Sequence, residues 1–450
     1  MLSQYWERVS SGFWFVPSIL VGGSVVLAWL TLALDEAVSS RWARERGWIY
    51  AGGADGAETI LGTIAGSMIT IAGVVFSLTL VALTLASSQF GPRLLRNFMR
   101  DTTNQVVIGT FISTFMYCLI VLRSINHEEP FLFVPHLSVS FAVFLALANL
   151  GVLIYFIHHV AKSIQADEVI ARVASELFEV IDRLFPEQIG EEGPRPPAWD
   201  AASLLPEGFD REARTVVSPE DGYLQAVDPD ALLKLAAERD LVLRLERRPG
   251  HYVVAGCPLV RAWPGAGLGE EFDELVIAAF MVGDNRTPLQ DVEFSINQLV
   301  EISIRALSPG VNDTFTPVTC LDRLGSAFCR LARREMPSPY RLDGENRLRV
   351  IAHPVTFPGV FDAAFSPIRR NARTNVVVTI RMLETIEHVA GAVCRPEDRR
   401  ELERQARMIR DGAREALPEP DDRRAVQERY DRALRRLGTA GRPDAPGTSG

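Results

Sequence analysis

The chain has 450 residues and a formal net charge of -9, and 47% of its residues are hydrophobic. Residues 1–164 carry nine basic and nine acidic side chains, so the whole net negative charge lies in residues 165–450. A nucleic-acid-binding protein needs a basic face to neutralise phosphates, and this charge balance therefore excludes nucleic acid as the expected partner.

Long apolar runs fill the first third of the chain. The run 59–92 contains no Asp, Glu, Lys or Arg in 34 positions. A helix needs roughly 20 apolar residues to cross a hydrocarbon layer of about 30 Å, and inside lipid every backbone polar group must be paired within its own segment. We therefore expect a transmembrane α-helical domain over residues 1–164 that forms a four-span bundle. Its spans are predicted near 13–34, 61–86, 106–122 and 132–158.

Four spans place both termini on one side of the membrane. That side holds Arg8, Arg93, Arg96, Arg100 and Lys162, against four arginines on the other side, and basic residues favour the cytoplasmic side. The five cysteines form no CxxC pair and no Cys/His cluster, which predicts reduced thiols and no metal site. We therefore expect a multi-pass protein with both termini in the cytoplasm.

A stripe of small and polar residues follows the second span. Its hydroxyl residues recur every seven positions, which is almost two helical turns, so their side chains share one face. Such a stripe is typical of close helix packing, within the bundle or between subunits, and the alternative is a pore lined by hydroxyls. The stripe comprises Thr63, Gly66, Ser67, Thr70, Gly73, Ser77 and Thr84.

The segment after this span is basic and amphipathic. Arg93, Arg96 and Arg100 fall on one helical face, which predicts either an interfacial helix that contacts lipid phosphates or an ordinary cytoplasmic loop. No charged residue lies deep in a span, which argues against an ion-coupled transporter. For the polar residues His136 and Asn149 we expect ordinary hydrogen bonds rather than ligand roles.

Several strings together resemble a known family. They are GTIAGSMITIAGVVFSLTLVALTLASSQFGPRLLRNFMRD, IGTFISTFMYCLIVLR, YFIHHVAKSIQAD, RTPLQDVEFSINQLVEISIRALSPGVND and RLRVIAHPVTF. In this order they are similar to the uncharacterised bacterial predicted membrane proteins called domain of unknown function 2254, from about Trp6 to Ala392. The resemblance implies a multi-span protein of the bacterial inner membrane with a C-terminal soluble region. It implies no particular biochemical activity for this chain. The chain departs from it at Thr314, where the family pattern has proline.

The remaining chain is predicted to form a mixed α+β cytoplasmic region, which its composition divides into several parts. We expect helices near 288–307, 316–334, 361–394 and 396–437, and two glycine-turn strands that flank a helix near 229–240. The glycine turn of the β-module lacks the attachment lysine that a lipoyl-type domain needs, which favours a structural role. The predicted parts are a juxtamembrane helix over 165–186, a linker over 187–214, a small β-rich module over 215–285, a helical domain over 286–437 and a disordered tail over 438–450.

Polar residues gather around the helix near 288–307. Asp291, Glu293, Asn312 and Asp313 carry the oxygen ligands that magnesium or calcium prefers, and they define a possible cytoplasmic ligand site. Helix capping by Asp313 and salt bridges explain the same residues without a ligand.

The chain contains no P-loop, GxGxxG, GxSxG or HExxH motif. We therefore expect no enzymatic activity and no cofactor. The leading hypothesis is an oligomeric channel or conduit with a cytoplasmic regulatory domain, whose partners are the lipid bilayer and further copies of the chain. A membrane-anchored scaffold or ligand sensor is the alternative.

Overall fold

The computed structural model describes residues 14–37, 50–91, 102–126, 133–185, 205 and 207–439. The chain divides into two compact units, Met1–Glu168 and Val169–Gly450, which we call the N-terminal unit and the C-terminal unit. Arg93, Arg96, Arg100, most of the predicted linker and most of the predicted tail lie outside the described residues.

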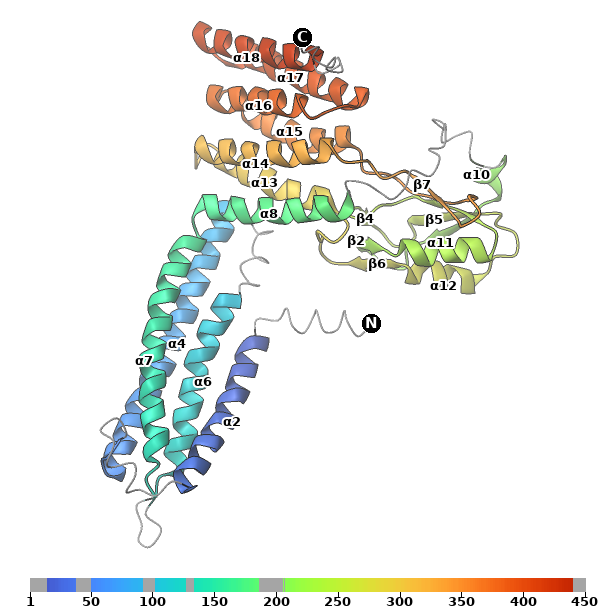
Figure 1. The fold of residues 1–450 in the computed structure, drawn as a ribbon. Helices are drawn as coiled ribbons and strands as arrows, with labels where there is room; N and C mark the ends of the chain where they lie inside the picture. The colour runs from blue at the N-terminus through green and yellow to red at the C-terminus, as the bar shows by residue number, and fades with distance from the viewer. Residues whose placement is uncertain are drawn as a thin grey trace, which may run out of the picture. The chain divides into compact units, whose positions relative to one another are not determined.

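The N-terminal unit contains four helices that are long and apolar enough to cross a membrane (Figure 1). Helix α6 contacts each of the other three and is the most buried of them. Its Phe111 and Tyr117 are fully buried and fill the middle of the bundle. The four helices are α2 (Phe15–Ala37), α4 (Ala54–Phe90), α6 (Thr102–Ser124) and α7 (His136–Ser163).

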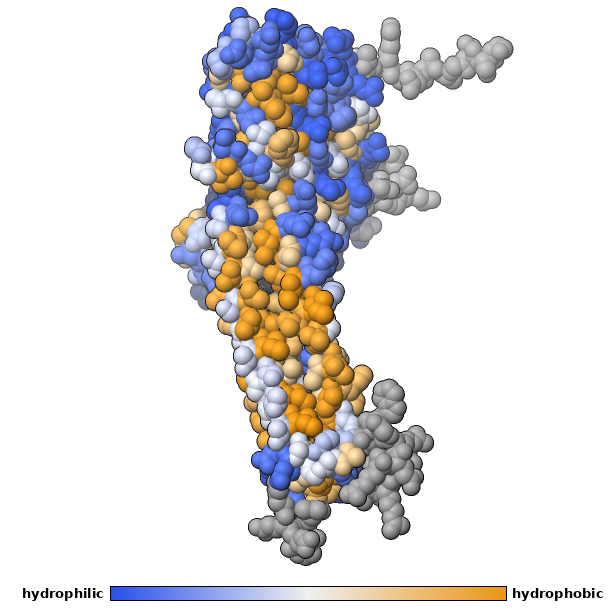
Figure 2. Space-filling model, turned by 90° about the vertical axis from the view of Figure 1, so that its left-hand side faces the viewer, coloured by the Kyte–Doolittle hydropathy of each residue, from blue (hydrophilic) through white to orange (hydrophobic). Residues whose placement is uncertain are grey.

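Large apolar side chains cover the outside of these helices. Trp29, Leu147 and Ile154 have 70%, 66% and 64% of their surfaces exposed. Figure 2 shows this apolar surface as an orange band on one face of the N-terminal unit. Soluble monomers rarely expose contiguous apolar patches beyond a few hundred Å², so this surface fits a lipid environment.

The C-terminal unit begins with the amphipathic helix α8 (Ala166–Leu184) and continues into a mixed α/β region. A five-stranded sheet has the order β1-β5-β3-β8-β7, in which only β3 and β8 are parallel, and a three-stranded antiparallel sheet has the order β4-β2-β6. The strands are β1 (Arg214–Val217), β2 (Gly222–Val227), β3 (Val242–Leu245), β4 (Tyr252–Val253), β5 (Pro258–Trp263), β6 (Phe280–Gly283), β7 (Tyr340–Leu342) and β8 (Leu348–Ile351).

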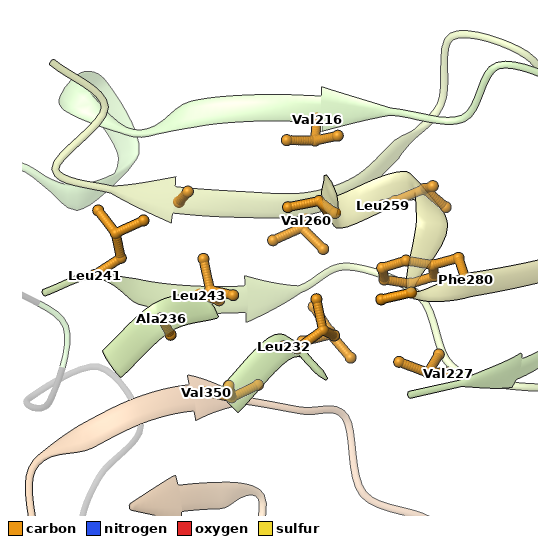
Figure 3. Packing of buried hydrophobic residues seen from close by; sticks show 14 of the residues in the cluster. Val216, Val227, Leu232, Ala236, Leu241, Leu243, Leu259, Val260, Phe280 and Val350 are labelled. Atoms are coloured by element: carbon orange, nitrogen blue, oxygen red, sulfur yellow. The ribbon is translucent and has the colours of Figure 1, made fainter. Parts of the chain in front are cut away.

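Both sheets share one hydrophobic core. Figure 3 shows Val260 of β5 and Leu243 of β3 beside Leu232 and Ala236, which come from helix α11 (Pro229–Glu238). Phe280 of β6 joins the same cluster, as does Phe272 of helix α12 (Glu270–Ala278). Because each strand alternates its side chains between two faces, every strand except β7 contributes residues of one face to this core.

The remaining helices form a stack of three hairpins (Figure 1). Helices α13, α15 and α17 contact one another in that order, and α14, α16 and α18 do the same, so the stack has two layers. The helices are α13 (Val292–Ala306), α14 (Phe315–Ala332), α15 (Phe357–Asn371), α16 (Val376–Ala390), α17 (Pro396–Ala416) and α18 (Pro420–Thr439). A four-residue helix, α10 (Phe209–Glu212), precedes β1.

Two expectations for residues 286–437 differ from the structure. The segment 340–351 forms strands β7 and β8 within the predicted helical domain, because β8 pairs with β3, a partner about a hundred residues earlier in the chain. The predicted helices 361–394 and 396–437 are four helices rather than two. Asn375 accepts from the Val378 amide and starts α16, and the segment 417–419 separates α17 from α18.

Candidate functional site

The stripe on α4 faces away from the rest of its own bundle. All seven stripe residues, from Thr63 to Thr84, are exposed. The buried residues of this helix lie on the opposite face, since one residue advances the helix by about 100°. Among those buried residues are Leu61, Ala65, Met68, Ala72 and Val75.

Nothing in the described part of the chain packs against this stripe. A Cβ built on Gly66 or Gly73 would have no neighbouring atom within 4 Å. The expectation of helix packing therefore fails for contacts inside the bundle, because α4 uses its alanine-rich face for those contacts. In a single copy this face is open to its surroundings, and the geometry does not test packing between subunits or the lining of a pore.

The hydroxyl groups of the stripe donate hydrogen bonds to their own helix. The Thr63 and Ser67 hydroxyls donate to the carbonyls four residues earlier at 2.7 Å, and Thr70 does so at 2.8 Å. A hydroxyl that donates one bond still has oxygen lone pairs that can accept another. Thr63, Ser67, Thr70 and Thr84 therefore present hydrogen-bond acceptors at the outer surface of the stripe, whereas the Ser77 hydroxyl makes no hydrogen bond within the described residues.

A polar cluster that sequence reasoning missed lies where α2 ends and α7 begins. The carboxylate of Asp35 on α2 accepts hydrogen bonds from the Leu137 and Ser138 amides at 2.8 and 2.9 Å and from the Ser138 hydroxyl at 2.7 Å. These amides belong to the first turn of α7, whose own N-cap residue is Pro135. Asp35 thus caps a helix about a hundred residues away, and its position beside Glu36 at the end of a span gave no sign of this contact.

The neighbouring polar residues extend this cluster. His136 Nδ1 lies 2.8 Å from the Tyr50 carbonyl oxygen, and the Tyr50 amide donates to the Ser140 hydroxyl at 2.7 Å. Deeper in the bundle, Asn149 donates to the Thr114 hydroxyl at 2.7 Å. The expectation that His136 and Asn149 make ordinary hydrogen bonds is confirmed.

The four residues of the predicted cytoplasmic ligand site lie at two ends of α13. Asp291 and Glu293 stand at its start, whereas Asn312 and Asp313 follow its end. A helix of 15 residues is about 22 Å long. The structure therefore brings Asp291 together with Glu293, and Asn312 together with Asp313, but it does not join the two pairs.

Arginine side chains already pair with both carboxylates of the first pair, Asp291 and Glu293. Asp291, which is 5% exposed, accepts from Arg286 at 2.6 and 2.8 Å and caps the Phe294 amide at 3.2 Å. Glu293 pairs with Arg248 at 2.7 Å. Burial raises the pKa of Asp291, and Arg286 opposes that rise. The pKa of nearby His251 is lowered by burial and by Arg248, which favours a neutral imidazole.

The second pair ends one helix and starts the next. The Asp313 carboxylate accepts from the Phe315 amide at 2.8 Å and from the Thr316 amide at 3.2 Å, so the predicted cap of α14 is confirmed. Asn312 has a φ of 49°, in the left-handed region that asparagine tolerates better than most residues. The predicted Glu301 and Arg305 pair is also present, at 3.5 Å. Both pairs of the predicted ligand site thus have structural partners.

A groove between α14 and α16 gathers residue types that occur in catalytic sites. Asp322, Ser326 and Cys329 of α14 and His388 of α16 line it. Burial raises the pKa of the Cys329 thiol, which disfavours the reactive thiolate. Within the residues that the structure covers, no group of three or more His, Cys, Asp or Glu side chains could hold a metal ion.

Comparison with known proteins gives the family of the chain. It is 34% identical over 382 residues to uncharacterized proteins of Mycobacterium bovis and Mycobacterium tuberculosis, an alignment that covers 82% of this chain and 70% of each relative. No solved structure matches the chain. Residues 10–388 match the family described as "Predicted membrane protein (DUF2254)". The chain therefore belongs to this family of predicted membrane proteins.

Proposed function

We propose that the protein is a homo-oligomeric membrane conduit in which the α4 stripes of several copies surround a common axis. The exposed stripe is the observation that carries this proposal. Seven small or hydroxyl residues share one outward face of a helix that is otherwise apolar, and the exposed Val74 and Val81 lie on the same face. Small residues permit close approach of neighbouring helices, and hydroxyl oxygens can replace part of the hydration of a permeating species.

The interior of one bundle does not offer a path of its own. Phe111, Tyr117 and Phe156 are fully buried along it, and two hydrophobic clusters occupy successive levels. A conduit built from this fold therefore needs α4 from more than one copy. Four of the five stripe hydroxyls donate to their own helix, those of Thr63, Ser67, Thr70 and Thr84. The groups that they would turn to the axis are acceptors, which favours water or a cation over an anion.

We further propose that the protein lies in the bacterial inner membrane with both termini in the cytoplasm. All five cysteines, among them Cys257 and Cys394 of the C-terminal unit, are free thiols. Free cysteines of this kind are typical of a reducing compartment. In this arrangement the C-terminal unit is a regulatory domain on the cytoplasmic side of the conduit.

Conductance of the purified protein in planar bilayers tests the conduit. Ser77→Leu places a branched apolar side chain on the stripe and is expected to reduce single-channel current at least several-fold, because it removes an acceptor and narrows the path. Leu147→Phe, on the exposed apolar face of α7, is the matched control and should leave the current unchanged. Wild-type protein that carries no current under any tested voltage or membrane tension contradicts the proposal.

Cysteine cross-linking tests the oligomer separately. Thr70→Cys places a thiol on the stripe and should give a disulfide-linked dimer on mild oxidation in membranes. Leu147→Cys exposes a thiol on α7 and should not, although both positions are exposed in a single copy. If Thr70→Cys stays monomeric, the stripe does not face another subunit.

A membrane-anchored scaffold or ligand sensor is the second candidate. The two-layered stack of helices α13 to α18, with its groove between α14 and α16, favours it, because stacked helical hairpins form extended binding surfaces. A protein without conductance that still binds a ligand through this stack would support this second function.

A further inference from the structure

A cavity of about 470 Å³ opens at the end of α15 and α17 in the C-terminal unit. One side comes from the last turn of α15 and the loop that leads into α16, and the other side comes from the last turn of α17. Its lining residues are Arg370, Asn371, Arg373, Thr374, Glu415 and Ala416.

Positive charge at this cavity is only partly compensated. Neither Arg369 nor Arg370 makes a hydrogen bond or ion pair with any residue that the structure covers, and the Nε atom of Arg369 is buried without a partner. Burial lowers the pKa of the Arg369 guanidinium, and the nearby Arg370, Arg404 and Arg373 lower it further, whereas Asp362 opposes this change. The hollow itself is lined by two guanidinium groups, those of Arg370 and Arg373, and by one carboxylate, that of Glu415.

Arg373 is held in place at the rim of the cavity. A Cβ built on Gly412 of α17 would lie 3.4 Å from Arg373 Nε, an ordinary van der Waals distance, so the Arg373 side chain lies against α17 at this residue. From this position Arg373 forms an ion pair with Glu415, whose side chain is 73% exposed. The pair is exposed enough for an incoming anion to take the place of the Glu415 carboxylate.

Helix electrostatics explains part of this arrangement. Basic residues near a helix C-terminus interact favourably with its dipole, which accounts for Arg369 and Arg370 in the last turn of α15. It does not account for Arg373, which follows the helix, or for the open space that Arg373 shares with Arg370. Guanidinium groups match the geometry of phosphate oxygens and bind them through paired hydrogen bonds.

We propose that this cavity binds a phosphate-bearing anion, with Arg370 and Arg373 as the donors and Glu415 as an internal competitor that the anion displaces. The ligand is either a free phosphate compound or the headgroup of an anionic lipid. Because this site lies in the C-terminal unit, it does not depend on whether α4 lines a conduit.

Titration calorimetry of the full-length protein in a neutral detergent tests the site, with inorganic pyrophosphate as the probe and constant ionic strength. Arg370→Gln and Arg373→Gln should each weaken binding about tenfold, since a hydrogen bond to a charged group contributes about that much. Glu415→Gln should tighten binding, because it removes the competing carboxylate. Arg424→Gln, at an arginine of α18 that pairs with Asp421 and is 70% exposed, is the matched control and should change nothing.

The arginine variants and Glu415→Gln should change the affinity for pyrophosphate in opposite directions. This difference distinguishes a specific site from general charge attraction. Equal losses in the variants of Arg370, Arg373 and Arg424, weaker binding in Glu415→Gln, or no binding by the wild-type protein would each overturn the proposal. The altered side chains are exposed or line an open cavity, so unchanged thermal melting confirms that each variant is folded.

Lipid nanodiscs then identify the source of the anion. In discs of phosphatidylcholine the pyrophosphate affinity should equal that in detergent. Partial replacement by phosphatidylglycerol lowers the affinity if lipid headgroups enter the cavity, and it leaves the affinity unchanged if the ligand comes from solution. Either result supports the anion site, and loss of binding in both kinds of disc contradicts it.

Discussion

The N-terminal bundle and the C-terminal helical stack are both made of packed helices, yet they distribute their aromatic residues in opposite ways. In the stack, Phe328, Phe357, Phe361 and Phe365 form one fully buried cluster. In the bundle, Phe144 and Trp29 have 60% and 70% of their surfaces exposed. The stack exposes few large apolar side chains, such as Phe315 of α14, whereas the bundle exposes many and needs a surrounding solvent that accepts them.

The largest expected effect comes from the centre of the phenylalanine cluster. Phe361→Ala should lower the free energy of unfolding of the C-terminal unit by about 3–5 kcal/mol, since it removes a large buried side chain and leaves a cavity. The ring of Phe361 stacks on that of Phe365 at 4.1 Å and contacts that of Phe328 at 4.7 Å, both measured between centroids. Denaturant unfolding of the full-length protein in detergent, followed by circular dichroism, measures the loss.

Phe144→Ala is the matched change in the bundle. Its ring faces outward, so truncation in detergent or lipid should have little effect on unfolding. A loss comparable to that of Phe361→Ala would mean that Phe144 is buried against protein, as it would be in a subunit interface on α7. The pair of variants therefore measures which solvent each region faces.

The polar contacts of the two regions differ as well. Ion pairs connect successive helices within one layer of the stack, as where Arg381 of α16 contacts Asp322 of α14 at 3.0 Å and Glu384 of α16 contacts Arg429 of α18 at 3.0 Å. In the bundle, the Asp35 carboxylate joins α2 to α7 through hydrogen bonds to backbone amides. This contact is a helix cap between distant segments and not an ion pair.

Asp35→Ala should therefore destabilise the bundle by about 1–2 kcal/mol, the usual effect of losing a helix N-cap. The change leaves the Leu137 and Ser138 amides at the start of α7 without their acceptor. Thermal denaturation in detergent, monitored by the loss of helical signal, measures the effect. Glu36→Ala alters the neighbouring carboxylate, which is exposed, and an equal effect of both variants would show that charge at this end of the bundle matters more than the cap.

Sequence reasoning predicted the features that depend on neighbours along the chain. The four apolar runs identified α2, α4, α6 and α7, and the Asp313 cap and the Glu301 pair followed from spacings of two to four residues. Features that depend on distant partners could not be found in this way. Strand β8 pairs with β3, and Asp35 caps α7, each across about a hundred residues.

The stripe on α4 also shows what the sequence could and could not predict. Its seven-residue spacing predicted that the residues share a face, and this is what the structure has. Which way that face points depends on the alanine-rich face opposite, which packs against α6 and α7. The spacing alone could not show which face of α4 packs inside the bundle and which points outward, because both faces carry small residues.

The smallest effect concerns Asp313, whose cap joins α13 to α14 through a loop rather than through a core. Burial tends to raise the pKa of Asp313, but hydrogen bonds from Thr316 and Phe315 lower it below its ordinary value of 3.8. A carboxyl group with a lowered pKa in the folded state stabilises the fold above the unfolded pKa, and this stabilisation is lost as the pH falls through the folded pKa.

Asp313→Ala should accordingly cost about 1 kcal/mol at neutral pH, and the difference from the wild-type protein should shrink as the pH falls below 3.8. Denaturant midpoints measured at a series of pH values test this, with Asp284→Ala at an exposed carboxylate as the control. A cost that stays constant with pH would show that the side chain acts through the loop conformation and not through its charge.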